Sequence, residues 1–123
     1  MYVRKPEDCA EIIANDGCKL RELLHPARGA GGVRYSLAVA RLDPGRATFP
    51  HRLTGESEAY YVLEGRGRLH VGADARELAP GEVALVPAGA EQWIESLGPA
   101  PLRFLNIVDP PWCAEHDVRT DGA

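Results

Sequence analysis

Residues 45–65 read GRATFPHRLTGESEAYYVLEG, and this stretch decides the fold. Its second half alternates, so that Glu58, Tyr60 and Val62 share one face of an extended chain. It ends at Gly65, within the turn sequence EGRG, where a tight turn needs a residue that tolerates positive φ. The stretch therefore predicts a half-buried β-strand that ends in a tight turn.

Similar turns recur along the rest of the chain. The 123 residues include 13 glycines and 10 prolines, which separate short runs rich in Val, Leu, Tyr, Ile and Trp. Short strands at this spacing, with no strong helical period between them, predict an all-β sandwich or barrel. The expected strands are Val33–Leu42, Ala59–Glu64, Arg68–Val71, Glu82–Val86, Glu91–Glu95 and Leu102–Val108.

The N-terminal segment has a less definite pattern. Leu20, Leu23 and Leu24 would share a helical face, yet Pro26 disfavours helix at the residue before it. A brief strand or a turn is therefore an equal expectation. We divide the chain into an N-terminal extension with a lead-in strand (1–32), one barrel (33–112) and a polar C-terminal tail (113–123).

Length and composition limit the classes of function. A chain of 123 residues with 45% hydrophobic and 26% charged residues is typical of one globular domain. Its net charge of −4 and its scattered basic residues argue against nucleic-acid binding. No apolar run reaches the roughly 20 residues of a membrane-spanning helix. Three cysteines without a CxxC pair favour reduced thiols, so we expect a cytoplasmic protein that binds neither nucleic acid nor membrane.

The opening stretch resembles the first of two motifs that mark the cupin superfamily. That motif is Gly, five residues, His-x-His, three or four residues, Glu, six residues, Gly. In this chain Gly45, His51, Glu58 and Gly65 keep every spacing. Leu53 stands where the family has its second histidine.

A second stretch resembles the other cupin motif, which is Gly, five residues, Pro-x-Gly, two residues, His, three residues, Asn. Gly81, Pro87 and Gly89 keep their places, whereas Gln92 replaces the histidine and Ser96 the asparagine. The resemblance implies an all-β, cupin-type double-stranded β-helix, that is, a jelly-roll-like barrel, here with a short N-terminal extension. It also implies a homodimer.

The resemblance implies a metal site, because the histidines and the glutamate of these motifs converge inside metal-binding cupin barrels. Carried across by position, the ligands of a divalent ion are His51, Glu58 and Gln92. One imidazole, one carboxylate and one amide oxygen could hold Zn, Mn, Fe or Ni, with water in the open positions. In the alternative, Glu58 hydrogen-bonds Gln92, His51 is satisfied at the barrel mouth, and no metal is present.

Two inward side chains are candidate substrate-binding residues. Tyr60 shares its face with Glu58, although core packing would explain it equally, and Asn106 is expected to point inward from the last strand. The small residues Ser36, Ala38 and Ala40 share one face of their strand. They leave room either for a ligand or for a partner chain.

One more pair could bind a metal. Cys113 and His116 are three residues apart in the C-terminal tail, a spacing that can chelate an ion. A single such pair in a polar terminus is more often incidental.

Three functions fit these observations, and the sequence does not decide whether the protein is an enzyme. In the first, a divalent ion in the barrel binds the oxygens of a small oxygenated metabolite, and Glu58 acts as the catalytic residue that moves protons. Isomerase, cyclase and lyase reactions are all of this type. In the second, the barrel holds a small ligand without metal and without catalysis. In the third, the protein is a mainly structural dimer, in which the polar residues at the barrel mouth simply meet water.

Overall fold

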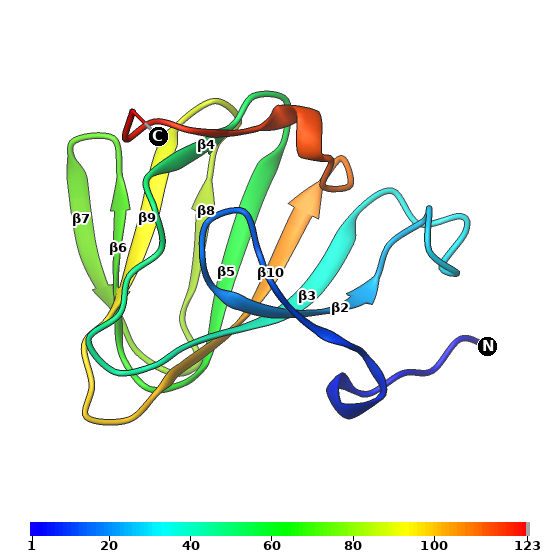
Figure 1. Cartoon of the computed structure of the whole chain (residues 1–123), viewed down its shortest axis with the longest axis horizontal. Helices are drawn as coiled ribbons and strands as arrows, with labels where there is room; N and C mark the ends of the chain where they lie inside the picture. The colour runs from blue at the N-terminus through cyan, green and yellow to red at the C-terminus, as the bar shows by residue number, and fades with distance from the viewer. Residues whose placement is uncertain (123) are drawn as a thin grey trace.

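The computed structural model describes residues 1–122 of the protein. It consists of two antiparallel β-sheets (Figure 1). The strands are β1 Glu11–Ile13, β2 Lys19–Leu24, β3 Ser36–Leu42, β4 His51–Leu53, β5 Ser57–Glu64, β6 Gly67–Val71, β7 Asp74–Leu78, β8 Val83–Val86, β9 Glu91–Ser96, β10 Leu102–Asp109 and β11 Asp117–Arg119. Two 3-10 turns, η1 Pro6–Asp8 and η2 Ala114–His116, complete the elements. The six-stranded sheet has the order β1-β2-β3-β10-β5-β8, and the five-stranded sheet has the order β11-β4-β9-β6-β7.

The all-β prediction is confirmed, and each of the six expected strands is present with small shifts at its ends. The helical alternative for residues 20–24 is wrong, because β2 pairs with β3 and places Leu20 opposite Ala40. Leu20 packs against the core from this strand. Four further strands, β1, β4, β7 and β11, were not expected from the sequence, because they are short or largely exposed and lack clear alternation.

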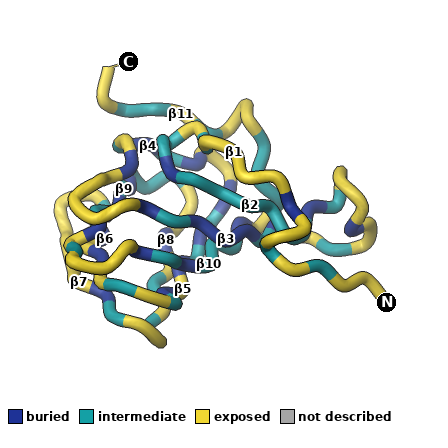
Figure 2. Tube along the Cα trace, turned by 60° about the horizontal axis from the view of Figure 1, so that its bottom comes forward, coloured by how far each residue is buried: buried dark blue, intermediate teal, exposed yellow. Residues whose placement is uncertain are grey.

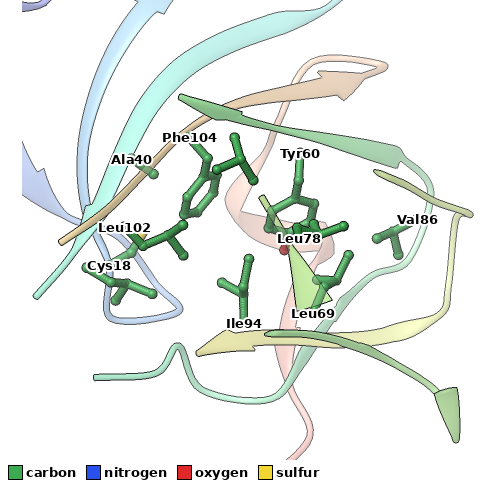
Figure 3. Close-up of a cluster of buried hydrophobic side chains, with 11 residues drawn as sticks. Cys18, Ala40, Tyr60, Leu69, Leu78, Val86, Ile94, Leu102 and Phe104 are labelled. Atoms are coloured by element: carbon green, nitrogen blue, oxygen red, sulfur yellow. The ribbon is translucent and has the colours of Figure 1, made fainter. Parts of the chain in front are cut away.

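The hydrophobic core fills the space between the two sheets (Figure 3). The rings of Tyr60 and Phe104 stack with their centroids 5.2 Å apart, and Ile94 packs with them from the opposite sheet. Figure 2 shows that buried positions follow the strands, whereas the loops are mostly exposed. Inward-facing residues from both sheets thus supply one continuous core.

The interior changes from apolar to polar along the strands. On β5 the inward residues are Val62, Tyr60 and Glu58, all of which are buried. The register of β10 places Asn106 beside Tyr60 and Val108 beside Glu58. One end of the barrel is therefore a packed core, and the other end presents buried polar groups.

The turn after β5 requires glycine. Gly65 has a φ of +76°, and a Cβ added there would lie 2.3 Å from the carbonyl oxygen of Pro101. Any side chain would therefore meet both a disfavoured backbone conformation and a steric clash. The prediction made for this glycine from the sequence is confirmed.

The two ends of the chain close over the polar end of the barrel. The turn between β1 and β2 reaches the segment before β4, where the amide of Phe49 donates to the carbonyl oxygen of Asp16 at 2.7 Å. At the other end of the chain, β11 pairs with β4 and places Arg119 opposite His51. Residues 1–122 contain no helix with the length and apolar character needed to span a membrane.

Candidate functional site

A cavity of about 1040 Å³ lies at the polar end of the barrel. Its walls come from the N-terminal segment, from β3, β4, β5 and β10, and from the C-terminal tail. Three of the sequence-predicted site residues, His51, Glu58 and Asn106, line this cavity. A concave space with a few convergent polar groups is the usual form of a small-molecule site.

Glu58 is a buried carboxyl group, with only 3% of its surface exposed. Its pKa is raised from 4.5 to about 8, chiefly by burial and also by the nearby charges of Asp16 and Asp117, and hydrogen bonds from Asn106 and Gln92 oppose this rise. The Asn106 amide donates to Glu58 Oε2 in a close contact. Glu58 therefore holds a proton at neutral pH and gives it up slightly above neutrality.

Tyr60 and Gln92 form a buried pair at the edge of the core. The Tyr60 hydroxyl donates to Gln92 Oε1, and the two side chains are 2% and 1% exposed. Neither residue lines the cavity. The ring of Tyr60 packs in the core, and the expectation that Tyr60 binds substrate stays a prediction.

His51 faces Glu58 from the opposite sheet, since β4 belongs to the five-stranded sheet and β5 to the six-stranded sheet. Its Nδ1–H donates to the carbonyl oxygen of Phe49 at 2.8 Å, which fixes the ring. Its Nε2 atom lies 3.8 Å from Asp16 Oδ2. The imidazole is thus oriented by the backbone, with a carboxylate beside its second nitrogen.

Two acidic residues of the site were missed by the sequence analysis. Asp16 comes from the turn between β1 and β2, and Asp117 comes from β11 at the other end of the chain. Asp117 Oδ2 accepts the indole N–H of Trp112 at 2.9 Å, whereas its Oδ1 is buried without a hydrogen-bond partner in the described chain. The only local signal was the turn sequence around Asp16, which does not indicate where the turn packs.

The small residues of β3 have two different environments. Ser36 and Ala38 line the cavity, and larger side chains at these two positions would reduce its volume. Ala40 is fully buried and packs in the core. The question raised by the sequence is therefore answered in favour of the pocket for Ser36 and Ala38.

Two of the three expected metal ligands, Glu58 and Gln92, are hydrogen-bonded to neighbouring side chains. The oxygen of Gln92 accepts from Tyr60, an oxygen of Glu58 accepts from Asn106, and Leu53 is buried at the fourth position. Among residues 1–122, no three His, Cys, Asp or Glu side chains of the cavity bring ligand atoms within 4.8 Å of one another. Binding of an ion by His51, Glu58 and Gln92 stays a prediction.

Comparison with known proteins agrees with this architecture. A family model described as a cupin domain matches residues 38–108. The chain belongs to the cupin family. This cupin is 37% identical over 103 residues to an uncharacterized protein of Methanocaldococcus jannaschii, and the match spans 84% of this chain and 82% of the relative.

Two further comparisons place the cupin among named relatives. It is 32% identical over 71 residues to the oxalate-binding protein of Thermotoga maritima, a match that spans 58% of this chain and 59% of the relative. The crystal structure of a cupin 2 domain-containing protein from Halorhodospira halophila superimposes with a TM-score of 0.77 at 21% identity, over 89% of this chain and 74% of that one. The expected cupin-type double-stranded β-helix is confirmed.

Proposed function

We propose that this cupin binds a small, uncharged, hydroxyl-rich metabolite in the cavity and isomerises it by proton transfer, with Glu58 as the catalytic acid and base. The observation that carries the proposal is the position of Glu58, a buried carboxyl group with a pKa of about 8 on the wall of a cavity of about 1040 Å³. A general base is most effective when its pKa lies near the working pH.

Glu58 can serve in both protonation states. Burial favours the neutral acid, which can donate a proton to a ligand oxygen. After the proton leaves, hydrogen bonds from Asn106 and Gln92 stabilise the carboxylate. Both forms are therefore populated close to neutral pH, as a group that alternately accepts and returns a proton requires.

His51 supplies a second proton site on the opposite wall. Its Nδ1 is bound to the backbone, so its Nε2 is the nitrogen available to a ligand, and Asp16 Oδ2 lies 3.8 Å from it. An isomerisation such as the interconversion of an aldose and a ketose moves one proton between neighbouring carbons and one between the oxygens. The reaction is balanced without an oxidant or a reductant, and it uses two such groups on opposite faces of the substrate.

The charges of the cavity select the class of ligand. Asp16 lines the cavity, and its carboxylate oxygens are acceptors for the hydroxyl groups of a ligand. Arg4 and Arg28 also line the cavity, and Arg28 is paired with Glu22. Beside Glu58, however, the carboxylates of Asp16 and Asp117 disfavour an anionic ligand. We therefore favour a sugar-like compound with several hydroxyl groups over a dicarboxylate.

Proton exchange with solvent tests the catalytic part of the proposal. Neutral aldoses and ketoses are incubated with the protein in D₂O and EDTA, and deuterium at the carbon beside the carbonyl is measured by NMR. We expect exchange that rises with pH, is half-maximal at about pH 8, where the ionisation of Glu58 is half complete, and levels off above it. Glu58→Gln should reduce the exchange by on the order of 100-fold or more, the usual contribution of a general base.

The control for this experiment is Glu64→Gln on the same strand, whose side chain is 66% exposed and distant from the chemistry. It should exchange like the unmodified protein. Exchange that requires an added divalent ion and disappears in EDTA would overturn the metal-free mechanism in favour of the predicted ion. The metal content of His51→Gln should equal that of the unmodified protein, since no ion is assigned to His51.

A second candidate function is binding without catalysis, and the likeness to a protein named as oxalate-binding favours it. Titration calorimetry with oxalate and with neutral sugars separates the two ligand classes. Because the inner wall carries Asp16 and Asp117, we expect oxalate to bind more weakly than a hydroxyl-rich ligand in EDTA. Tight binding of oxalate without metal, together with an absence of exchange, would establish the binding function instead.

A further inference from the structure

Outside the cavity, three metal-ligating side chains meet where the C-terminal tail lies against the barrel. Glu56, Cys113 and His116 bring one ligand atom each within 4.8 Å of one another. Within residues 1–122, no other group of three His, Cys, Asp or Glu side chains does so. None of the three residues lines the cavity, so the cluster is separate from the candidate active site.

The geometry of this cluster centres on one carboxylate oxygen. Glu56 Oε2 lies 2.6 Å from His116 Nδ1 and 3.8 Å from Cys113 Sγ. The other oxygen, Oε1, accepts the backbone N–H of Gly55 at 3.2 Å. Glu56 is only 4% exposed, and its side-chain neighbours are a thiol and a half-exposed imidazole, so a cation placed among them would be paired with a buried carboxylate.

The backbone holds both tail ligands in place. Cys113 is the N-cap of the 3-10 turn η2, and the amide of His116 donates back to its carbonyl oxygen at 3.3 Å. The carbonyl oxygen of His116 in turn accepts the amide of Thr54 at 3.0 Å. A Cβ at Gly55 would lie 3.2 Å from His116 Nδ1, so glycine lets the imidazole approach closely. The site is therefore preorganised by contacts that do not depend on a metal.

The donor set indicates which ion fits. A thiolate, an imidazole and a carboxylate together are typical of Zn²⁺, whereas Ca²⁺ and Mg²⁺ prefer oxygen donors alone. We propose that Glu56, Cys113 and His116 bind one Zn²⁺ ion with a water molecule in the fourth position, and that this ion fastens the C-terminal tail to the barrel.

Such an ion would also stabilise one wall of the cavity. Trp112 precedes Cys113, and Asp117 follows His116, so the two cavity-lining residues flank the zinc ligands. They are joined by the hydrogen bond from Trp112 Nε1 to Asp117 Oδ2. The ion would therefore restrain the tail on both sides of this hydrogen bond, without taking part in the chemistry of the cavity.

Cobalt substitution tests the site directly. Metal-free full-length protein is titrated with Co²⁺, and the near-ultraviolet charge-transfer band of a cobalt–thiolate bond is followed by absorption. We expect the band to saturate at about one ion per chain and Zn²⁺ to displace the cobalt. Zn²⁺ should also raise the melting temperature by several degrees, because it binds the folded state alone.

Two variants and two matched controls complete the test. Cys113→Ser should abolish the band, and His116→Gln should weaken Co²⁺ binding by more than about tenfold. Cys9→Ser removes another thiol, and His70→Gln removes a histidine that lies 2.6 Å from Glu95 with no third donor, so both should bind like the unmodified protein.

An absence of the band in the unmodified protein, or a band that survives in Cys113→Ser, would overturn the zinc site. If Cys113→Ser does not fold, His116→Gln provides an independent test, because His116 is half-exposed. Equal Co²⁺ affinity in His116→Gln and in the unmodified protein would also overturn the zinc site. Neither result depends on the reaction proposed for the cavity, which does not involve this ion.

Discussion

Glu58→Gln tests the central electrostatic property of the site, the raised pKa of a buried carboxyl group. The glutamine has the shape of the neutral acid but cannot ionise. Folding of the unmodified protein moves the pKa from 4.5 to about 8, so the folded state binds a proton that the unfolded state has lost in this pH window. The contribution of protonated Glu58 to the free energy of unfolding is fully present below pH 4.5 and is lost as the pH rises through about 8.

The size of the effect follows from the shift. At 1.36 kcal/mol per pH unit, the interval from 4.5 to about 8 corresponds to a loss of at most about 5 kcal/mol. The Glu58→Gln variant cannot ionise, so it does not undergo this pH-dependent loss of stability. Its amide NH₂ group can face the N–H donors of Asn106 and Gln92, which costs about 1–3 kcal/mol of stability at every pH. We therefore expect the variant to be less stable than the unmodified protein near pH 5 and more stable near pH 9.

Urea unfolding in EDTA at a series of pH values measures this difference. Subtracting the two free energies of unfolding cancels the titration of groups that both proteins share. Glu64→Gln, at the exposed end of the same strand, should give a difference that does not change with pH. A difference for Glu58→Gln that varies by less than about 0.5 kcal/mol between pH 5 and pH 9 would refute the raised pKa and remove the basis of the acid–base proposal.

Three further predictions use the same denaturation or metal assays. Tyr60→Phe leaves the buried oxygen of Gln92 without its donor and should reduce the free energy of unfolding by about 1–3 kcal/mol, and an unchanged value would mean that this hydrogen bond is not formed. Gly65→Ala combines a φ of +76° with a Cβ 2.3 Å from a backbone oxygen, and it should reduce the free energy of unfolding by well over about 2 kcal/mol. Gly72→Ala has a φ of +57° but open space around the Cβ, and it should reduce the free energy of unfolding by only about 1–2 kcal/mol. Equal losses in these two variants would contradict the steric argument. Leu53→His combined with Gln92→His restores the histidines of the family motif and should create a barrel metal site, seen as one additional ion per chain in metal analysis.

Much of the barrel could be predicted from short-range patterns. The alternation around Tyr60 and the glycine at 65 follow from the two-residue period of a strand and from the sterics of a turn, and both agree with the structure. The strand β11 could not be predicted in this way, because its three residues have no clear period. It forms because β4 offers an unpaired edge to which it can hydrogen-bond.

The sequence by itself determined the all-β fold and placed Glu58 and Asn106 on inward faces, because successive side chains along a strand point to opposite faces of the sheet. Only the tertiary structure decided the character of the site. Asp16 and Asp117 reach Glu58 from opposite ends of the chain, and the resulting charge and burial raise its pKa. The same packing assembles Glu56 with Cys113 and His116. Distances between segments that are remote in sequence depend on how the whole chain packs, and desolvation depends on what covers a residue, so neither can be obtained from a local pattern.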